Sequence, residues 1–280
     1  MGAAAASERA REFPFTQRDF DYLRTLTRSK TGIVVDDDKF DMFYSRLSRR
    51  VRQLRLGSFA EYCDRIRAGD AEEEGHLINA ITTNLTAFFR ENHHFEYLAN
   101  TLVPEFLANG GREFRIWSAG CSTGEEPYSL AITLLEAGLP ARARVTIKAT
   151  DLDSNVLATA RAGVYDLTRV EGISPARRKR WFLKGTGVNS GKVRVKDELK
   201  KPIEFGQLNL MSDWSVPPQD VIFCRNVIIY FDKETKQRLV DRYAEALAPG
   251  GYLVIGHSES LYKVSERFES LGNTIYRKLR

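Results

Sequence analysis

Polar residues of the kinds that bind ligands follow predicted strands along this 280-residue chain. The first group comes after the apolar run 114–119, where Gly120 and Gly124 bracket a turn of small residues before an expected helix. Because glycine has no Cβ, a ligand can approach the backbone closely there. Parallel α/β sheets bind ligands beyond the carboxyl ends of their strands, so residues at successive strand ends should converge. The other residues of this strand-end set are Glu125, Glu126, Asp151, Asp153, Asn209, Arg225 and Asn226.

The turn that ends at Glu126 indicates which ligand it would suit. It has no Gly-Lys-Ser/Thr, so it is not a P-loop, and it lacks the full Gly-x-Gly-x-x-Gly fingerprint. Acidic residues stand at the positive start of the expected helix, where they would repel a phosphate. Asp151 ends the second strand, where such folds bind a ribose diol, although it could instead cap a helix, a role that better suits Asp153 or Ser154. We therefore expect a nucleoside ligand that carries positive charge, and S-adenosylmethionine fits that description.

The histidines predict no metal site. His93 and His94 are adjacent, so on a helix they cannot face one ligand together. His76 and His257 have no partner at a metal-ligand spacing, and the chain has neither a His-Glu-x-x-His motif nor paired cysteines. We expect no metal cofactor.

Composition is typical of an ordinary globular protein. Hydrophobic residues make up 42% of the chain and charged residues 28%, and the net charge of +5 would favour an acidic partner only weakly. No stretch approaches the ~20 apolar residues of a membrane span, and the alanine run 3–6 is too short for a signal peptide core. Three widely spaced cysteines, Cys63, Cys121 and Cys224, argue for a reducing cytoplasm and against a disulfide framework.

From residue 114 onward the pattern alternates between strands and helices. This predicts an α/β fold with a doubly wound, mostly parallel sheet over 114–280. The expected strands are 114–119, 144–150, 220–224, 252–256 and one near 273–278, and the expected helices are 127–136, 155–162 and 233–247. Residues 248–251, Ala-Pro-Gly-Gly, read as a break between a helix and a strand.

The first part of the chain is expected to be helical. Residues 1–12 are predicted to be a disordered tail, 13–83 a helical domain and 84–113 a linker with a connecting helix. Phe43, Leu47 and Val51 follow a helical spacing, and arginines fill the rest of that helix surface. The helix is either a solvated amphipathic helix, the default for such a charge run, or a docking face for an acidic helix. The arginines are Arg46, Arg49, Arg50, Arg52 and Arg55.

One segment does not fit the alternation. Residues 184–195 are rich in glycine and then alternate like a strand, with a turn expected around 189–191. We expect a small antiparallel β-subdomain inserted at about 183–206.

Five motifs in order resemble the bacterial chemotaxis receptor methyltransferases, the CheR family. They are Asn84-Leu-Thr-Ala-Phe-Phe-Arg-Glu91, Ser122-Thr-Gly-Glu-Glu-Pro-Tyr128, Ala149-Thr-Asp-Leu-Asp153, Phe223-Cys-Arg-Asn-Val-Ile-Ile-Tyr-Phe231 and Gly256-His-Ser-Glu259. The resemblance extends from about residue 16 to the C-terminus. It implies a class I S-adenosylmethionine-dependent methyltransferase fold and a protein-glutamate O-methyltransferase.

The resemblance also implies roles for individual residues. Asn84, Thr86 and Arg90 would reach the cofactor, beside Gly120. Glu126 and Asp151 would hold its amino-acid and ribose parts, in an order that the sequence leaves open. The adenosine side would be closed by Asn209, Leu210, Arg225 and Asn226, and Tyr230 would line the methyl-transfer cleft with Arg90. The arginine helix would bind the receptor.

The implied partners are methyl-accepting chemotaxis receptors, without nucleic acid or membrane insertion. The enzyme would act as a monomer in the cytoplasm, recruited to receptor arrays. In the pentapeptide-dependent type of the family, the inserted subdomain grips the receptor's C-terminal pentapeptide. Here Lys184, Gly191 and Arg194 would contact it, with Arg194 clamping the terminal carboxylate. The alternative is a surface hairpin without a ligand.

The reaction would need no general base. A glutamate carboxylate is ionised at pH 7, with an unperturbed pKa of about 4.3, so it can attack an activated methyl group directly. Two other functions remain open: a methyltransferase with another acceptor, for which the arginine helix would contact phosphates, or a non-catalytic cofactor-sensing scaffold. Against a nucleic-acid amino-methyltransferase, Cys224 is followed by Arg-Asn-Val rather than Asn-Pro-Pro and an aromatic residue.

Overall fold

The computed structural model describes residues 11–139 and 143–279, which form two compact units divided between Thr82 and Thr83. Most of the tail expected at 1–12 lies outside the described residues. Its last two residues are described: Arg11 pairs with Asp41, and Glu12 pairs with Arg52. No helix among the described residues has both the length and the apolar character needed to cross a bilayer.

The first unit is a bundle of four α-helices. They are α1 (Gln17–Thr31), α2 (Phe40–Gln53), α3 (Phe59–Arg67) and α4 (Ala71–Ile81), with a 3₁₀ turn, η1 (Asp37–Lys39), before α2. Side chains at the N-caps explain where three of them begin: Thr16 forms a capping box with Asp19, and Ser58 and Asp70 accept bonds from the first turns of α3 and α4. The apolar stripes of the helices, including Phe20, Phe43 and Leu47, form one fully buried core.

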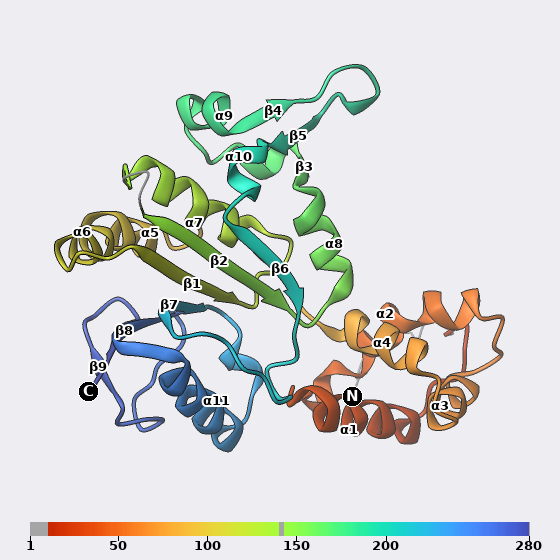
Figure 1. Ribbon diagram of the computed structural model, residues 1–280. Coiled ribbons are helices and arrows are strands. Elements are labelled where there is room, and N and C mark those ends of the chain that lie inside the picture. Colours follow the sequence, from red (N-terminus) through yellow and green to blue (C-terminus); the bar gives the residue numbers. More distant parts are fainter. Residues whose placement is uncertain (1–10, 140–142, 280) are drawn as a thin grey trace, which may run out of the picture. The chain divides into compact units, whose positions relative to one another are not determined.

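The second unit is built on a seven-stranded sheet (Figure 1). The order across the sheet is β6-β2-β1-β7-β8-β10-β9, and only β10 runs antiparallel to its neighbours, so the mostly parallel, doubly wound sheet is confirmed. The strands are β1 (Glu113–Ala119), β2 (Arg144–Asp151), β6 (Ile203–Gln207), β7 (Gln219–Cys224), β8 (Leu247–Ile255), β9 (Phe268–Ser270) and β10 (Ile275–Lys278).

Helices cover both faces of this sheet (Figure 1). One face carries α7 (Glu125–Glu136), α8 (Ser154–Ala162) and a helical run of α5 (His93–Tyr97), a π-helical turn η2 (Leu98–Leu102) and α6 (Val103–Ala108). The other face carries α11 (Lys233–Ala246), which packs on β8. The helical run 93–108 lies where a connecting helix was expected, and its apolar residues belong to the core of the sheet.

Two strands of the large sheet were not predicted, and a third, β8, has different bounds from those expected. Strands β6 and β9 were not predicted because each is short and has only one buried residue. The expected break at 248–251 lies inside β8, where the chain bulges out opposite β7: Gln219 pairs with Leu247, and Val221 pairs with Tyr252. Gly250, at φ 74°, permits this irregularity.

A three-stranded antiparallel sheet projects from the second unit, with the order β3-β5-β4. Its strands are β3 (Val164–Asp166), β4 (Phe182–Lys184) and β5 (Lys192–Val195), with the 3₁₀ turn η3 (Leu167–Val170) and helix α9 (Pro175–Trp181) between β3 and β4. A second 3₁₀ turn, η4 (Gly187–Asn189), joins β4 to β5, and the short helix α10 (Asp197–Lys200) follows. The insertion expected at about 183–206 therefore has different bounds: it begins with β3, and residues 203–207 belong to the large sheet as β6.

Candidate functional site

The order of the strands places a switch point at β1, which lies between β2 and β7. Parallel strands lead away from it on both sides, and sheets of this kind usually bind ligands between the two loops that diverge at such a point, here the loops after β1 and β7. The region between these loops is called the crevice below. The loop after β1 is tied to β2 because the N–H groups of Gly120 and Cys121 both donate to Thr150 O, at 2.8 and 2.9 Å. Gly120 (φ 110°) and Gly124 (φ 98°) both have positive φ, which glycine can adopt without strain because it has no Cβ.

Asp151 closes this loop from the end of β2. Its Oδ2 accepts the N–H of Ser122 at 2.8 Å, and its Oδ1 accepts the N–H of Asp153 at 3.0 Å. Burial raises the pKa of the Asp151 carboxyl, against these hydrogen bonds. The alternative role of helix cap belongs instead to Asp153, whose side chain accepts the N–H groups of Asn155 and Val156 at the start of α8.

Arg225 organises the other side of the crevice. This buried guanidinium follows β7 and pairs with Glu126 (Nη1–Oε2, 3.0 Å) and Glu91 (Nη2–Oε2, 3.2 Å). It also donates to the carbonyl oxygen of Arg90. Glu126 accepts a further bond from Ser118 Oγ at 2.7 Å, and burial raises the pKa of its carboxyl although Arg225 opposes this. The nitrogen Nε of Arg225 is buried without a hydrogen-bond partner in the described structure.

Two carboxylates in this region were not predicted as site residues. Glu91 also accepts from His257, Nδ1 to Oε1 at 2.7 Å. Burial acts to raise the pKa of Glu91, but the His257 hydrogen bond and the Arg225 charge bring it below its ordinary value. Glu259 accepts the N–H groups of Asn226, Gly256 and Ile229 at 2.6 to 3.1 Å, and so fixes the loop after β7. Glu91 and Glu259 each end one of the five motifs that resemble the CheR family. Their place in these motifs is the sequence signal that could have identified them as site residues.

The segment before α5 reaches the same loop. Asn84 Nδ2 donates to Asp153 Oδ2 at 2.8 Å, and its carbonyl oxygen accepts from Ser122 Oγ at 3.1 Å. Arg90 is half-buried and donates from Nη1 to Leu85 O at 2.8 Å. Thr86 is half-buried two residues after Asn84. The structure therefore brings the start of this segment to the loop after β1, and its end to Arg225.

The remaining predicted cofactor residues follow β6 and β7. Asn209 Oδ1 accepts the N–H of Met211, and the carbonyl oxygen of buried Leu210 accepts from Arg242 and Trp214. Asn226 has a left-handed backbone, φ 58°, and its amide lies where a Cβ at Gly256 would stand. Tyr230 lies half-buried in the 3₁₀ turn η5 (Ile228–Tyr230).

The five predicted receptor-binding arginines belong to the helical unit and differ in environment. Arg50 pairs with buried Glu73, donating from Nε at 2.9 Å, whereas Arg46 donates to the carbonyl oxygens of Ala80 and Thr82. Exposed Arg52 pairs with Glu12, and exposed Arg49 has no ion-pair partner among the described residues. Arg55 lies beyond the end of α2 with φ 57°, so the helix does not carry all five.

The three predicted tether residues lie on the small sheet. Lys184 ends β4, Gly191 precedes β5 with φ 82°, and Arg194 is exposed on β5. Because β5 is the central strand, Arg194 does not lie on an edge; β4 and β3 are the edges. A peptide that adds as a strand would have to join β4 or β3.

One group of potential metal ligands occurs in the helical unit. Ligand atoms of Glu72, Glu73 and His76 lie within 4.8 Å of one another. This group was not predicted because the other potential ligands near His76 are two preceding carboxylates rather than a second histidine or a cysteine. Glu73 already binds Arg50, which explains the cluster as part of an ion-pair network.

The large sheet and its crevice define a class of protein: an α/β nucleoside-binding fold whose acidic residues suit a cationic ligand, as in S-adenosylmethionine-dependent methyltransferases. Residues 84–277 match the family model "CheR methyltransferase, SAM binding domain", and residues 18–82 match "CheR methyltransferase, all-alpha domain". The chain belongs to the CheR methyltransferase family, and its cofactor is S-adenosylmethionine.

Curated relatives align over nearly the whole chain. "Chemotaxis protein methyltransferase 2" of Pseudomonas aeruginosa is 49% identical over 95% of this chain and 94% of that protein. "Chemotaxis protein methyltransferase" of Salmonella typhimurium is 45% identical over 90% and 86%, respectively. The protein of the same name from Escherichia coli is 42% identical over 92% and 89%.

Proposed function

We propose that this chain methylates glutamate side chains in the cytoplasmic domains of chemoreceptors, giving glutamate 5-O-methyl esters. The observation that carries the proposal is the complete strand-end site, in a chain that matches both domains of the CheR family. The names of its relatives indicate a role in chemotaxis, and the acceptor follows from that role.

The residues of the crevice fit the cofactor. Asp151 uses one lone pair of each oxygen for a backbone N–H, and an ionised carboxylate has about four acceptor positions, so it can also accept from a ribose diol. Glu126 and Asp151 supply negative charge for a ligand with a sulfonium and an ammonium group. Gly120 and Gly124 are required by packing, since a Cβ would lie 2.4 Å from Val227 Cγ2 at the first position and 2.9 Å from Ala160 Cβ at the second. Asn84, Thr86, Gly120, Asn209, Leu210, Arg225 and Asn226 complete the proposed cofactor site.

The transfer itself depends on position rather than on acid–base chemistry. S-adenosylmethionine supplies a methyl group that its sulfonium already activates. A receptor carboxylate oxygen forms the new C–O bond, and the electron pair of the broken C–S bond stays on sulfur. Correct alignment of such groups can contribute up to ~7–11 kcal/mol. Arg90, anchored at Leu85 O, would orient the carboxylate, and Tyr230 would line the same cleft.

The helical unit would recognise the receptor through the arginines of α2. Arg49 is the best candidate for this contact because its side chain is exposed and has no ion-pair partner among the described residues, and Arg52 is the next because its partner Glu12 is itself exposed. Arg50 and Arg46 would act indirectly, since Glu73 and two carbonyl groups occupy them. The favoured partner surface is an acidic helix near the methylation sites.

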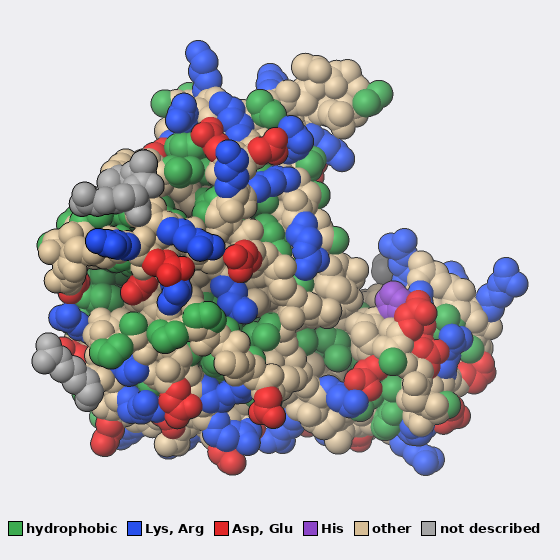
Figure 2. Space-filling view, in the orientation of Figure 1, with side chains coloured by type: hydrophobic (Ala, Val, Ile, Leu, Met, Phe, Trp, Pro, Cys, Tyr) green, Lys and Arg blue, Asp and Glu red, His purple; other side chains and the backbone are tan. Residues whose placement is uncertain are grey.

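The small sheet would tether the enzyme to a C-terminal receptor pentapeptide, as in the pentapeptide-dependent type. Figure 2 shows Lys and Arg side chains gathered on this sheet and the helices beside it. Residues 164–201 contain eleven Lys and Arg against four Asp and Glu, whereas the whole chain has 42 against 37. This local excess suits a peptide that ends in a free carboxylate, joining edge strand β4 beside Lys184, with Arg194 on the neighbouring strand.

A peptide titration tests the tether. A peptide that copies a host receptor's C-terminus should bind with a micromolar dissociation constant, and Arg194→Ala should weaken it. Lys233→Ala, a change of an exposed cation on α11, is the matched control. The tether is absent if the amidated peptide binds as well as the free acid.

The enzyme would act as a cytoplasmic monomer recruited to receptor arrays. Sedimentation with and without receptor fragments checks the stoichiometry.

A panel of acceptors tests the reaction. Methyl-labelled cofactor is supplied with receptor membranes, DNA or RNA in separate reactions. Base-labile label that leaves the receptor as methanol identifies a carboxyl ester. Label on nucleic acid would identify another methyltransferase, and cofactor binding without transfer to any acceptor would indicate a sensing scaffold.

A further inference from the structure

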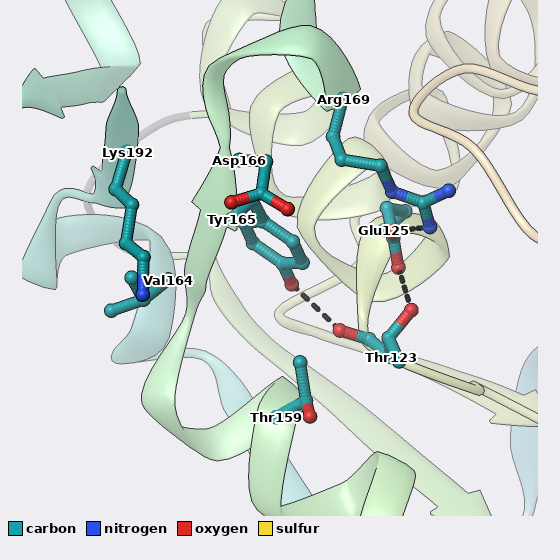
Figure 3. A pocket seen from close by; sticks show the side chains of 8 residues that line it. All are labelled: Thr123, Glu125, Thr159, Val164, Tyr165, Asp166, Arg169 and Lys192. Atoms are coloured by element: carbon teal, nitrogen blue, oxygen red, sulfur yellow. Dashed lines mark hydrogen bonds and ion pairs between the residues drawn. The ribbon is translucent and has the colours of Figure 1, made fainter. Parts of the chain in front are cut away.

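Side chains of the small sheet and of the turn η3 contact the loop after β1. Tyr165, on β3, donates its hydroxyl hydrogen to Thr123 O at 2.7 Å (Figure 3). The Tyr165 side chain is buried in the core of the second unit. A strand of the small sheet therefore contacts the glycine turn 120–124 directly.

A second contact comes from the turn η3. Arg169 donates to Glu125 Oε1, while Thr123 Oγ1 donates to the other carboxylate oxygen at 2.6 Å. The Glu125 side chain is fully buried, whereas that of Arg169 is 40% exposed. Both contacts thus end on the residues that flank Gly124 (Figure 3).

Packing at Gly124 shows how closely the two parts fit. A Cβ at this position would lie 3.0 Å from Tyr165 Oη and 2.9 Å from Ala160 Cβ. Gly124 and Ser122 both have positive φ, and Ser122 is not a glycine, so the turn is held in a conformation that surrounding contacts must maintain. Those contacts are Asp151 on one side and Tyr165 on the other.

The contact between β3 and the turn 120–124 is not packed throughout. A cavity of about 280 Å³ lies between β3 and the turn, bordered by Thr159, Val164, Asp166 and Lys192 as well as by the residues just described. A shortened side chain at Arg169 therefore leaves open space, but it also removes the cation that pairs with buried Glu125, so the stability of each Arg169 variant is measured beside its cofactor binding.

We propose that Tyr165 and Arg169 are positioning residues for cofactor binding. Through Thr123 and Glu125 they set the shape of the turn 120–124, which aligns the Ser122 N–H with Asp151 and leaves the front of the turn for the cofactor. This proposal rests on the cofactor role of that turn proposed above. It gives β3 and η3 a part in the cofactor site, distinct from any receptor contact of the small sheet.

A pair of tyrosine variants tests it in the full chain. Tyr165→Phe removes only the bond to the turn. Tyr128→Phe removes an equally short bond, 2.7 Å, from a buried hydroxyl to a backbone carbonyl, but that carbonyl belongs to Ala160 on α8. Loss of one such bond predicts a three- to tenfold rise, on the order of one hydrogen bond, in the dissociation constant of S-adenosylhomocysteine for Tyr165→Phe. Tyr128→Phe should change it less than twofold while lowering the melting temperature similarly.

Arg169 supplies a second comparison. Arg169→Gln should raise KM for the cofactor and leave kcat unchanged at saturating cofactor, because the turn is bound less often in its proper shape. Arg169→Lys, which keeps the charge, should recover most of the affinity.

Unchanged product affinity in both Tyr165→Phe and Arg169→Gln would overturn the proposal, as would an equal loss in the two tyrosine variants. Wild-type protein that fails to bind S-adenosylhomocysteine would instead contradict the proposed cofactor site itself. The two failures are therefore distinguishable.

Discussion

The crevice of the large sheet and the surface of α2 both concentrate charge, but in opposite ways. In the crevice buried Arg225 binds two carboxylates, that of buried Glu126 and that of Glu91, whose side chain is 10% exposed. On α2, Arg49 and Arg52 point into solvent. A buried charge without a partner costs several kcal/mol, whereas an exposed ion pair contributes about 0–1 kcal/mol. The charged groups of the crevice must therefore keep one fixed geometry. The exposed arginines of α2 can attract an acidic partner but are not held in one position.

Arg50 shows that the difference between buried, paired charges and exposed charges depends on the surroundings of each side chain and not on the helix that carries it. It lies on α2, yet it binds buried Glu73 as Arg225 binds Glu126. The difference is that Glu73 serves only the helical bundle, while Glu126 and Glu91 lie beside a ligand crevice. A buried carboxylate–arginine pair is therefore not in itself a sign of function.

Removal of Arg225 should have the largest effect. Arg225→Met leaves buried Glu126 without its cation and removes the arginine partner of Glu91, so the free energy of unfolding should fall by about 3–5 kcal/mol. Urea denaturation measures this. Arg267→Met, which removes an exposed partner of Glu245, is the control and should cost less than about 1 kcal/mol. Equal small losses in the two variants would remove the distinction between the regions.

The pH dependence of the free energy of unfolding provides a second test of the buried groups near the crevice. Burial, with the nearby Arg225 charge, lowers the pKa of His94 to about 4, although Glu91 opposes this. The unfolded chain takes up this proton near pH 6.5 and the folded chain does not, so stability is lost as pH falls from about 6.5 to about 4. The loss attributable to His94 should reach about 3 kcal/mol at pH 4.

His94→Gln isolates this effect because glutamine can still donate to Asn273 O, which His94 Nε2 contacts at 2.9 Å. The variant should lose less stability than wild type over this range in urea denaturation at several pH values. Parallel curves for the two proteins would show that the buried imidazole is not held neutral.

Asp151 should have an intermediate effect, confined to the cofactor. Asp151→Ala is expected to weaken cofactor binding by ~1.5–3 kcal/mol, the range for a hydrogen bond to a charged group. Calorimetric titration with S-adenosylhomocysteine, with and without a chelator, measures it and also tests for a metal requirement. Wild-type affinity in the variant would exclude Asp151 from the site, and chelator-sensitive binding would contradict metal-free binding.

The exposed arginines should give the smallest effect per residue. Arg49→Glu with Arg52→Glu should lower receptor methylation several-fold and leave cofactor affinity unchanged, and wild-type activity should fall with salt because exposed charges are screened over ~10 Å at 0.1 M. Arg18→Glu, an exposed change on α1, is the matched control. If the double variant methylates receptors like wild type, α2 is only a solvated helix.

The sequence predicted the part of the fold that depends on local pattern. Strand and helix alternation predicted β1, β2, β7 and the helices after them, because β1 and β7 are mostly buried and β2, although only partly buried, has eight residues. Short β6 and β9 and the bulge in β8 depend on pairing with distant strands, which no local pattern records.

The same limit applies to the site. The strand ends pointed to Gly120 and Asp151, and the family resemblance added Arg90. Neither indicated that Arg225 binds Glu126 and Glu91, since these residues are far apart in the chain. Nor did the spacing show that β5 is a central strand, which moves any added peptide strand to β4 or β3.

Identification of the atom that receives the methyl group is the most direct test of the proposed reaction. A purified receptor cytoplasmic fragment is incubated with the enzyme and S-adenosylmethionine, digested, and mapped by mass spectrometry before and after mild base. Methyl groups are expected on glutamate side chains, where base should remove them, and far fewer are expected when the protein carries Asp151→Ala at limiting cofactor. Base-stable methyl groups on lysine, arginine or the backbone, or an unmodified fragment beside another labelled acceptor, would contradict it.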